Sequence, residues 1–418
     1  MRTIRCNSGT DSTVWMGEDV FRLVASMLPQ AELISLFALW IPRGFLMSEV
    51  QDREYMLRAI ELAKAGEGWA HPNPMVGAVI VKDGRIIGEG YHRKCGELHA
   101  ERNAIAALTE PADGATIYVT LEPCCHYGKT PPCTEAIIEN RISRVVIGSR
   151  DPNPLVSGKG ARILREAGIE VNEDFLREEC DAINPVFFHY ITTKTPYIIM
   201  KYAMTADGKI ATKAGASKWI TGEEARNEVH RIRHACMGIM AGIGTVLADD
   251  PLLNCRLEYA PAGACQPIRI ICDSKLRIPY DSQICRTADV YETIVACADP
   301  EDGEKVSQLQ KLGITVLNLP ERSTSRVDLR KLMEHLGERG IDSVLLEGGG
   351  DLNDSALRAG IVNEVRAFIA PKIFGGAAKS PAQGTGVERP AEAFPMELIG
   401  IEHFGEDIML RYIVHAPI

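Results

Sequence analysis

Three short segments carry residue types that together could hold a metal ion. His99-Ala100-Glu101 opens a predicted helix, Pro123-Cys124 follows a predicted strand, and Pro132-Cys133 opens the next predicted helix. One imidazole and two thiolates suit Zn²⁺, which binds nitrogen and sulfur ligands tetrahedrally and keeps one position for water in catalytic sites. Helix N-termini lower the pKa of a thiol and so favour the thiolate ligand.

The carboxyl group of Glu101 lies two residues after His99, so it can reach a water at the metal without binding the metal. In that position it can take a proton as water attacks a substrate and give the proton to a leaving amine. The pattern therefore indicates hydrolytic deamination.

The cysteine spacing departs from the zinc deaminase signature H-x-E…P-C-x-x-C. Tyr127 stands three residues after Cys124, so the second thiolate is Cys133, or Cys125 takes part. The structural alternative is that these cysteines are merely buried and His99 is a capped core histidine. His-x-Glu combined with two Pro-Cys steps on successive elements disfavours that alternative.

A second candidate site follows an apolar strand in the C-terminal half. Ser343–Leu346 runs into Glu347 and the glycines Gly348–Gly350, with a helix expected beyond. Glycines between a strand and a helix let backbone amides approach a phosphate at the helix N-terminus. The pattern is not G-x-G-x-x-G with a distal acid, so the fold of the common dehydrogenases is not supported. Taken alone, a glycine triplet also fits a tight turn.

The elements around the first site alternate between strand and helix after an opening hairpin. Lys82-Asp83-Gly84 is a hairpin turn signal between Met75–Val81 and Ile86–Tyr91. This alternation predicts an α/β sandwich with a largely parallel sheet. The further expected elements are helices around Val50–Leu62, His99–Leu108, Thr134–Asn140 and Ala161–Ala167, and strands Thr116–Leu121, Val145–Gly148 and Ile169–Val171.

A closing helix over Phe175–Tyr190 and a linker over Ile191–Pro196 are expected before a second α/β pattern begins at Tyr197. Two domains with separate sheets are therefore predicted. The strands expected in the second are Tyr197–Ala203, Met237–Ala241, Ile268–Cys272, Thr293–Ala296, Thr315–Leu317, Ser343–Leu346 and Val365–Ile369, with helices Glu223–His234, Glu304–Leu312 and Leu329–Leu336 between them.

Composition limits the partners. The 418 residues are 45% apolar and 24% charged, which is typical of soluble globular proteins. No apolar run approaches the length of about 20 residues that a membrane span needs. The net charge of −10 argues against non-specific electrostatic binding of nucleic acid, so an anionic substrate needs a local basic pocket. The 12 cysteines occur without a secretion signal, so reduced thiols and a cytoplasmic location are expected.

The segment before Met47 differs from the rest. Acidic residues at Glu18, Asp19 and Glu32 argue against a transit peptide, and no small-residue cleavage site follows the apolar run Leu33–Ile41. We expect residues 1–47 to be an extension of doubtful function, with Met47 as the functional start.

Four strings in the first half resemble the deaminase half of the bifunctional riboflavin-biosynthesis deaminase/reductase family. They are HPNPMVGAVIVKDG (71–84), HAE (99–101), TLEPCCHYGKTPPC (120–133) and DPNP (151–154). The long EPC-x8-C spacing is normal in that family. The resemblance implies that His99, Cys124 and Cys133 bind zinc and that Glu101 is the acid/base. Cys125 departs from the family, because serine is common there, and it places an extra thiol beside the expected metal site.

The resemblance also implies that Asn73, His92, His126 and Lys129 line the pyrimidine and phosphate pocket. An amide can read a base edge, and a lysine and a histidine can serve an anion. Turn statistics alone would instead make Asn73 a turn cap in His-Pro-Asn-Pro. Asp151 and Asn153 fit a turn on any interpretation.

The second half resembles the reductase half of the same family through KYAMTADGKIA (201–211), SKWIT (217–221), GIGTVLADDPLLNCR (242–256) and LLEGGGDLN (345–353). The resemblance implies a dihydrofolate-reductase-like fold. The residues implied to contact NADPH are Ala203, Trp219, Thr245, Asp249 and the loop of Gly349, Gly350, Asp351, Leu352, Asn353, Asp354 and Ser355. Those implied to contact the substrate are Ser217, Arg233, Leu253, Arg256 and Glu347.

Arg233 and Arg256 suit a phosphate, because a guanidinium binds phosphate with two parallel hydrogen bonds. Without the family context, either could equally be an ordinary surface arginine. Lys201 and Asp207 are the candidates for a general acid in this half.

We therefore expect a cytidine-deaminase-like three-layer sandwich over residues 48–192 and a dihydrofolate-reductase-like α/β domain over 196–418. The expected function is zinc-dependent deamination of 2,5-diamino-6-(5-phosphoribosylamino)pyrimidin-4(3H)-one. NADPH then reduces the ribosyl chain of the product to ribityl.

The alternatives are a zinc deaminase for another nucleobase, nucleoside or tRNA, and a binding protein with one inactive half. Small phosphorylated pyrimidines are the expected partners, without nucleic acid or membrane. Both a monomer and a homo-oligomer are compatible with the sequence.

Overall fold

The computed structural model describes residues 43–128, 131–153, 156–257, 263–298, 303–322 and 324–415. The chain divides into two compact units, Met1–Arg58 and Ala59–Ile418, and helix α3 (Arg43–Lys64) runs across the boundary. No helix within those described ranges is both long and apolar enough to cross a bilayer. The expectations for residues 1–42 lie outside the described residues, as does that for Lys129.

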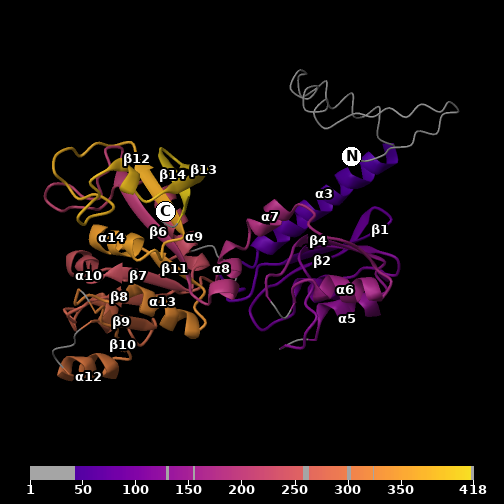
Figure 1. Ribbon diagram of the computed structural model, residues 1–418, viewed down its shortest axis with the longest axis horizontal. Helices are drawn as coiled ribbons and strands as arrows, with labels where there is room; N and C mark the ends of the chain where they lie inside the picture. The colour runs from indigo at the N-terminus through magenta and orange to yellow at the C-terminus, as the bar shows by residue number, and fades with distance from the viewer. Residues whose placement is uncertain are drawn as a thin grey trace, which may run out of the picture. The chain divides into compact units, whose positions relative to one another are not determined.

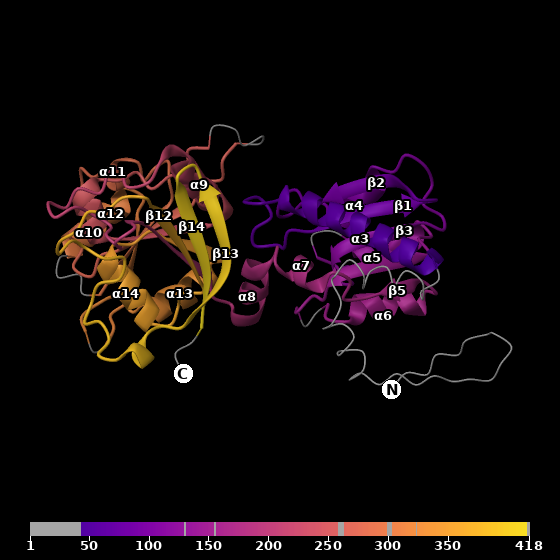
Figure 2. The ribbon, with the colours of Figure 1, turned by 90° about the horizontal axis from the view of Figure 1, so that it is seen from above.

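A five-stranded sheet forms in the first half of the larger unit (Figures 1 and 2). Its strands lie in the order β2-β1-β3-β4-β5. The β1–β2 and β1–β3 pairs are antiparallel, whereas β3–β4 and β4–β5 are parallel, which confirms an opening hairpin followed by a parallel sheet. The strand bounds are β1 Gly77–Lys82, β2 Arg85–Tyr91, β3 Thr116–Leu121, β4 Arg144–Ser149 and β5 Glu170–Asn172.

Helices cover both faces of this sheet. The helices α4 (Ala100–Ala106), α5 (Cys133–Glu139) and α6 (Lys159–Glu166) share one core with the strands. On the opposite face, the part of α3 after Arg58 approaches β1 so closely that a Cβ on Gly77 would lie 1.9 Å from the carbonyl oxygen of Ala59. This close approach explains the glycine and completes a three-layer sandwich.

A nine-stranded sheet forms the second half, in the order β10-β9-β8-β7-β11-β6-β12-β14-β13. Every pair from β10 to β12 is parallel, and the last two strands form an antiparallel hairpin. The bounds are β6 Tyr197–Thr205, β7 Gly238–Gly242, β8 Ile268–Cys272, β9 Thr293–Cys297, β10 Thr315–Asn318, β11 Ser343–Leu346, β12 Glu364–Ala370, β13 Met396–Phe404 and β14 Asp407–Val414.

Helices also cover both faces of the second sheet. Side chains of α13 (Leu329–Glu338) and α14 (Gly350–Arg358) pack in one core on one face. The helices α9 (Glu223–Ala235), α10 (Ile243–Asp249), α11 (Gln283–Arg286) and α12 (Gly303–Lys311) pack in two cores on the other face. The buried strands read as continuous apolar runs, as expected for a parallel sheet that is covered on both sides.

Two expectations about the segment between the sheets are wrong. The single helix predicted over Phe175–Tyr190 is two helices, α7 (Arg177–Asp181) and α8 (Pro185–Thr193). Proline has no N–H to continue a helix and suits its first turn, so a new helix starts at Pro185. The linker expected from Ile191 begins later, because α8 continues to Thr193 and Lys194 ends the helix in the left-handed conformation.

Candidate active sites

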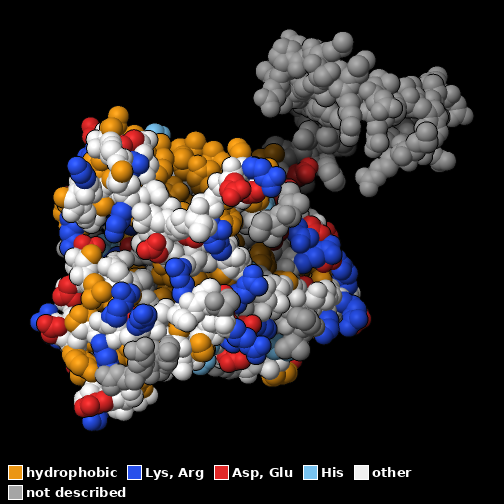
Figure 3. Space-filling view, turned by 60° about the vertical axis from the view of Figure 1, so that its left-hand side comes forward, with side chains coloured by type: hydrophobic (Ala, Val, Ile, Leu, Met, Phe, Trp, Pro, Cys, Tyr) orange, Lys and Arg blue, Asp and Glu red, His pale blue; other side chains and the backbone are white. Residues whose placement is uncertain are grey.

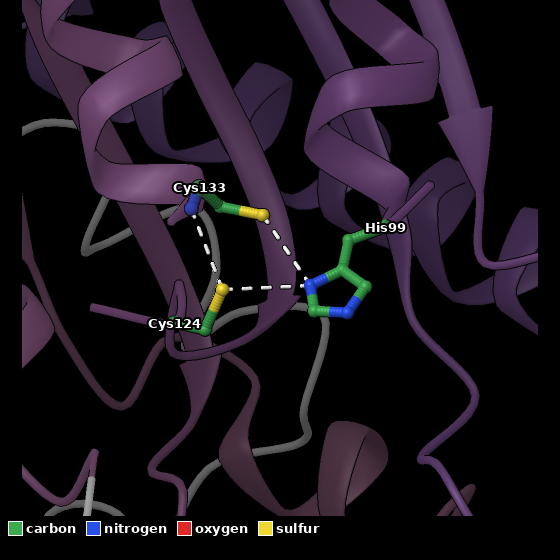
Figure 4. Close-up of side chains that lie close together, drawn as sticks. All are labelled: His99, Cys124 and Cys133. Carbon is green, nitrogen blue, oxygen red and sulfur yellow. Dashed lines mark hydrogen bonds between the residues drawn. The ribbon is translucent and has the colours of Figure 1, made fainter. Parts of the chain in front are cut away.

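The three predicted zinc ligands meet in the first half of the larger unit (Figure 4). His99 precedes α4, Cys124 lies in the loop after β3, and Cys133 is the first residue of α5. Sγ of Cys124 lies 3.4 Å, and Sγ of Cys133 lies 3.5 Å, from Nδ1 of His99. The fold thus brings together residues that are up to 34 positions apart.

These distances fit a tetrahedral zinc ion. Zinc–sulfur bonds of about 2.3 Å and zinc–nitrogen bonds of about 2.0 Å at a tetrahedral angle place sulfur and nitrogen roughly 3.5 Å apart. Hydrogen bonds with Cys133 and then His99 lower the pKa of the Cys124 thiol to about 4, although burial opposes this. Because both sulfur atoms lie close to Nδ1, this is the His99 atom that faces the metal position.

Glu101 is buried beside the three ligands without being one of them. It is 3% exposed, in the first turn of α4. Burial, and then the nearby charge of Cys124, raise the pKa of the Glu101 carboxyl. A carboxyl group with a raised pKa can hold and release a proton near neutral pH.

A cavity of about 540 Å³ opens next to this cluster, and Asn73, His92, His126 and Glu101 line it. Nδ2 of Asn73 lies 3.1 Å from Nε2 of His92, and Nδ1 of His92 lies 3.1 Å from the carbonyl oxygen of Leu98. Burial lowers the pKa of His92, so its ring is neutral. Its Nδ1–H then donates to Leu98 and its Nε2 accepts from Asn73. Asn73 is therefore held by His92, with its amide oxygen left for another donor.

Two further residues mark the cavity as a polar ligand site. Nδ1 of His126 is buried and has no hydrogen-bond partner within the described ranges. Asp151 also lines the cavity, and burial raises the pKa of its carboxyl to about 6. Sequence reasoning assigned Asp151 and Asn153 only to a turn. The turn exists, because Oδ1 of Asp151 accepts from the Asn153 amide, but both residues also face the cavity.

A second cleft, of about 1100 Å³, crosses the start of α14 in the second half. Gly349 caps this helix, and the Leu352 amide donates to its carbonyl, whereas the amides of Gly350 and Asp351 have no acceptor among the described residues. A Cβ on Gly349 would lie 3.8 Å from the hydroxyl oxygen of Thr245 in α10. A Cβ on Gly350 would lie 2.8 Å from the carbonyl oxygen of Ser380. The glycine at Gly350 is therefore required by packing against Ser380 and Gln383, and the two amides without an acceptor suit a dinucleotide pyrophosphate.

The residues expected to contact the cofactor divide into two groups. The cleft is lined by Thr245, Asp249, Gly349, Gly350, Asp351, Leu352 and Ser355, and by the expected substrate residue Ser217. Four other expected residues do not line it. Ala203 packs in a core, and Trp219 is exposed with Arg226 over its ring. Asn353 is fully buried with Nδ2 bonded to the Pro381 carbonyl, and Asp354 pairs with Arg358.

A buried charge cluster lies at the end of β11. The guanidinium of Arg233 donates to both carboxylate oxygens of Glu347, at 2.6 and 3.0 Å, and Nζ of Lys201 lies 3.7 Å from the same carboxylate. Burial alone would raise the pKa of Glu347, but the charges of Arg233 and Lys201 outweigh it and lower the pKa to about 2. Arg233 was expected to bind a phosphate with its fork, but that fork is occupied by Glu347.

Asn254 connects this cluster to the other expected phosphate ligand. Its backbone oxygen accepts from Arg233 at 2.8 Å, and its side-chain oxygen accepts from Nη1 of Arg256 at 2.7 Å. Arg256 is exposed, whereas Leu253 is buried with a φ of 51°. Arg256 is therefore the more accessible of the two arginines. On the face of the molecule in Figure 3, basic side chains occur in small groups among acidic and apolar ones.

Asp207 does not suit the role of a general acid. Its carboxylate accepts hydrogen bonds from the Thr205 hydroxyl and from the amides of Phe374 and Gly375. The hydrogen bond from Thr205, followed by those from the two amides, lowers the pKa of Asp207 to about 2. An ionised carboxylate that fastens a loop cannot donate a proton near neutral pH. Of the two candidates, only Lys201 keeps this role open.

Two family models match the chain. Residues 49–149 match the "Cytidine and deoxycytidylate deaminase zinc-binding region", and residues 196–410 match the "RibD C-terminal domain". The riboflavin biosynthesis protein RibD of Actinobacillus pleuropneumoniae is 56% identical over 368 residues, which cover 88% of this chain and 96% of that protein. The RibD of Escherichia coli is 39% identical over 373 residues, which cover 87% of this chain and 100% of that protein.

Solved structures agree with these matches. Acinetobacter baumannii RibD, form 1, superposes with a TM-score of 0.79 at 37% identity, covering 88% of this chain and all of that one. A Thermotoga maritima structure, titled as a diaminohydroxyphosphoribosylaminopyrimidine deaminase/5-amino-6-(5-phosphoribosylamino)uracil reductase, has a TM-score of 0.76 at 38% identity with the same coverage. The predicted pair of folds is confirmed.

Proposed function

The chain belongs to the RibD family of riboflavin-biosynthesis proteins, and from that premise we propose how its two sites divide the chemistry. It is a bifunctional enzyme, a zinc-dependent deaminase and an NADPH-dependent reductase, whose substrates are small phosphorylated pyrimidines. We propose that the substrates are those in the name of the Thermotoga maritima relative.

In the first reaction, 2,5-diamino-6-(5-phosphoribosylamino)pyrimidin-4(3H)-one and water give ammonia and 5-amino-6-(5-phosphoribosylamino)uracil. His99, Cys124 and Cys133 would hold the zinc ion, which when bound supplies a Lewis acid that makes water a better nucleophile. Glu101 takes a proton from the attacking water and passes it to the departing amine. The observation that carries this role is its buried carboxyl beside three convergent metal ligands.

The rest of the cavity positions the pyrimidine. Asn73, held by His92, offers its amide oxygen to an N–H of the base. Nδ1 of His126 is buried and has no hydrogen-bond partner among the described residues, so we propose that it bonds to a polar group of the substrate. Lys129 is proposed as a phosphate ligand on the resemblance alone. Asp151 is a further candidate to contact the base, because it faces the same cavity.

In the second reaction, NADPH supplies a hydride to C1′ of the ribosyl group, and a proton is taken up as the sugar opens to ribityl. Lys201 is the proton donor that we propose, since its ammonium lies against Glu347 at the buried end of this site. The side chains of Arg233 and Glu347 hold each other in place through two hydrogen bonds. Arg256 is then available to bind the substrate phosphate.

We also propose a cytoplasmic location. Every cysteine among the described residues is a free thiol, several of them only partly buried, and such thiols and thiolate metal ligands persist in a reducing compartment.

The test of the first site is Glu101→Gln. We expect this variant to bind one zinc ion per chain, measured by mass spectrometry of the metal, and to release ammonia at least 100-fold more slowly. Glu139→Gln on the exposed side of α5 is the matched control and should keep both properties. Wild-type ammonia release from Glu101→Gln would overturn the assigned role.

A further inference from the structure

The dinucleotide cleft has two chemically different ends. One end, which follows β6 in the chain, includes Ile210, Ala211 and Ser217, and Ser217 is an expected substrate contact that lines this cleft. The other end includes Ser274 after β8 and Arg326 before α13. A pyrophosphate at the start of α14 lies between these ends, and the nicotinamide must lie toward the substrate. The adenosine half of the cofactor therefore extends toward Ser274 and Arg326.

NADPH differs from NADH only by a phosphate on the 2′-oxygen of the adenosine ribose. Selecting NADPH requires a cation at the adenosine end whose charge is not already neutralised. The lining of the cleft includes five basic side chains: Arg277, Arg326, Arg330, Arg358 and Lys379.

Three of the five do not meet this requirement. Arg358 pairs with Asp354 at 2.9 Å, and Arg277 lies 3.7 Å from Asp273, so a carboxylate already faces each of them. Lys379 belongs to the opposite end, because its carbonyl accepts the amide of Ile210.

Arg326 and Arg330 have no carboxylate within 4.0 Å in the described part of the chain. Nε of Arg330 donates to the carbonyl of Ala359, beyond the C-terminal end of α14. Nη1 of Arg326 lies 3.3 Å from the hydroxyl oxygen of Ser355, one turn earlier.

The position of Ser355 suits the 2′-phosphate. It lies five residues after Gly350, which is about 7.5 Å along the helix from the amides that face the pyrophosphate. One ribose separates the two phosphate groups in the cofactor, and that sugar spans a similar distance. The hydroxyl of Ser355 donates to the carbonyl of Asp351, so it can accept from Arg326 and orient the guanidinium.

Resting on the cofactor use proposed above, we propose that Arg326 binds the 2′-phosphate and selects NADPH over NADH. Ser355 is its positioning residue. The guanidinium has further N–H groups beyond the one directed at Ser355, and these can form charge-assisted hydrogen bonds with the phosphate. The selection is therefore made by one exposed side chain and not by the glycine-rich start of α14, which serves both cofactors equally.

Glu321 and Asp328 are acidic residues of the same segment that line this end of the cleft, and Asp328 already lies 3.6 Å from the ammonium of Lys331, so Glu321 is the one to weigh against Arg326. The carboxylate of Glu321 accepts a hydrogen bond from the hydroxyl of Thr324. An acidic side chain at a ribose favours the unphosphorylated 2′-hydroxyl. Glu321 would therefore favour NADH, whereas Arg326 would favour NADPH. Measuring the affinity for each cofactor shows which side chain dominates.

The test compares NADP⁺ with NAD⁺, and 2′,5′-ADP with 5′-AMP, by titration calorimetry on the full chain. We expect Arg326→Gln to weaken the binding of NADP⁺ and of 2′,5′-ADP about 10- to 100-fold, which is the effect of losing one charged hydrogen bond. Binding of NAD⁺ and 5′-AMP should change less than twofold. Arg326→Lys keeps the charge and should keep part of the preference. Arg330→Gln, on the same cleft wall, is the matched control and should leave the NADP⁺/NAD⁺ ratio unchanged.

Three outcomes would overturn the proposal. Arg326 does not select the cofactor if Arg326→Gln keeps the wild-type ratio of NADP⁺ to NAD⁺ affinity, or if Arg277→Gln loses that ratio instead. A wild-type chain that prefers NAD⁺ would show the same. A wild-type chain that binds neither dinucleotide would contradict the proposed reductase itself. Failure of the inference and failure of the function are therefore distinguishable.

Discussion

Replacing Glu347 by glutamine removes the negative charge from the buried cluster at the end of β11. Arg233 loses the carboxylate that holds both arms of its guanidinium, and Lys201 loses its counter-ion at 3.7 Å. Glutamine has a similar size and keeps one acceptor oxygen, so the change is electrostatic and leaves no cavity. We expect the second sheet to lose stability while the first keeps it.

The magnitude follows from the pKa of Glu347, which is lowered from 4.5 to about 2 in the fold. A depressed carboxylate pKa stabilises the fold above the unfolded pKa, and this stabilisation disappears as the pH falls through the folded pKa. A difference of this size is worth about 3 kcal/mol at pH 7, and about 2 kcal/mol of it is lost by pH 3. Breaking a buried ion pair by removing one partner has a cost of the same order.

The assay is urea unfolding, read by pulsed hydrogen exchange and mass spectrometry of peptides from β6 and β11. Peptides from β3 report on the first sheet in the same sample. Glu347→Gln should unfold the second sheet about 3 kcal/mol more easily at pH 7 and about 1 kcal/mol more easily at pH 3. Glu402→Gln, whose carboxylate is partly exposed 3.8 Å from Arg411, is the control and should cost under about 0.5 kcal/mol. A gap between wild type and Glu347→Gln that stays constant from pH 7 to pH 3 would refute the reasoning.

Three further predictions concern the metal, a buried arginine and a helix start. Removing zinc with a chelator should stop ammonia release but leave NADPH oxidation with the deaminated substrate intact, and added zinc should restore ammonia. Arg269→Met should destabilise the second sheet by about 3–5 kcal/mol in urea unfolding, because Arg269 is fully buried and donates to the hydroxyls of Thr287 and Thr293 and to four backbone carbonyls. Equal stability would contradict this. Gly350→Ala should weaken 2′,5′-ADP at least 10-fold in calorimetry, since its Cβ would lie 2.8 Å from a backbone oxygen. Unchanged affinity would remove the helix start from the phosphate site.

Local signals in the sequence were sufficient where burial determines the structure. Thr116–Leu121, Ile268–Cys272 and Ser343–Leu346 were predicted with the observed bounds, because each is a short, mostly apolar and buried run between turn signals. A zinc site at His99 and Cys124 could be predicted because few residue types bind zinc and each candidate stood at the end of an element, but the family resemblance was needed to choose Cys133 over Cys125.

Features that depend on distant partners could not be predicted. Glu347 occupies the fork of Arg233, from 114 positions away, and no local pattern reveals such a pairing. The role of Asp151 in lining the cavity was hidden because its sequence also makes a turn. The β13–β14 hairpin was missed because β13 is exposed along most of its length, so burial did not give it an alternating apolar pattern.

One measurement tests the central claim that a single chain carries out both reactions. The purified chain is incubated with the diaminopyrimidine phosphate and NADPH, and ammonia and NADPH absorbance are followed together. Our account predicts that ammonia appears first and that one NADPH is oxidised per ammonia released, with neither change in Glu101→Gln. Ammonia without NADPH oxidation would contradict the second site, and NADPH oxidation without ammonia would contradict the order of the two reactions.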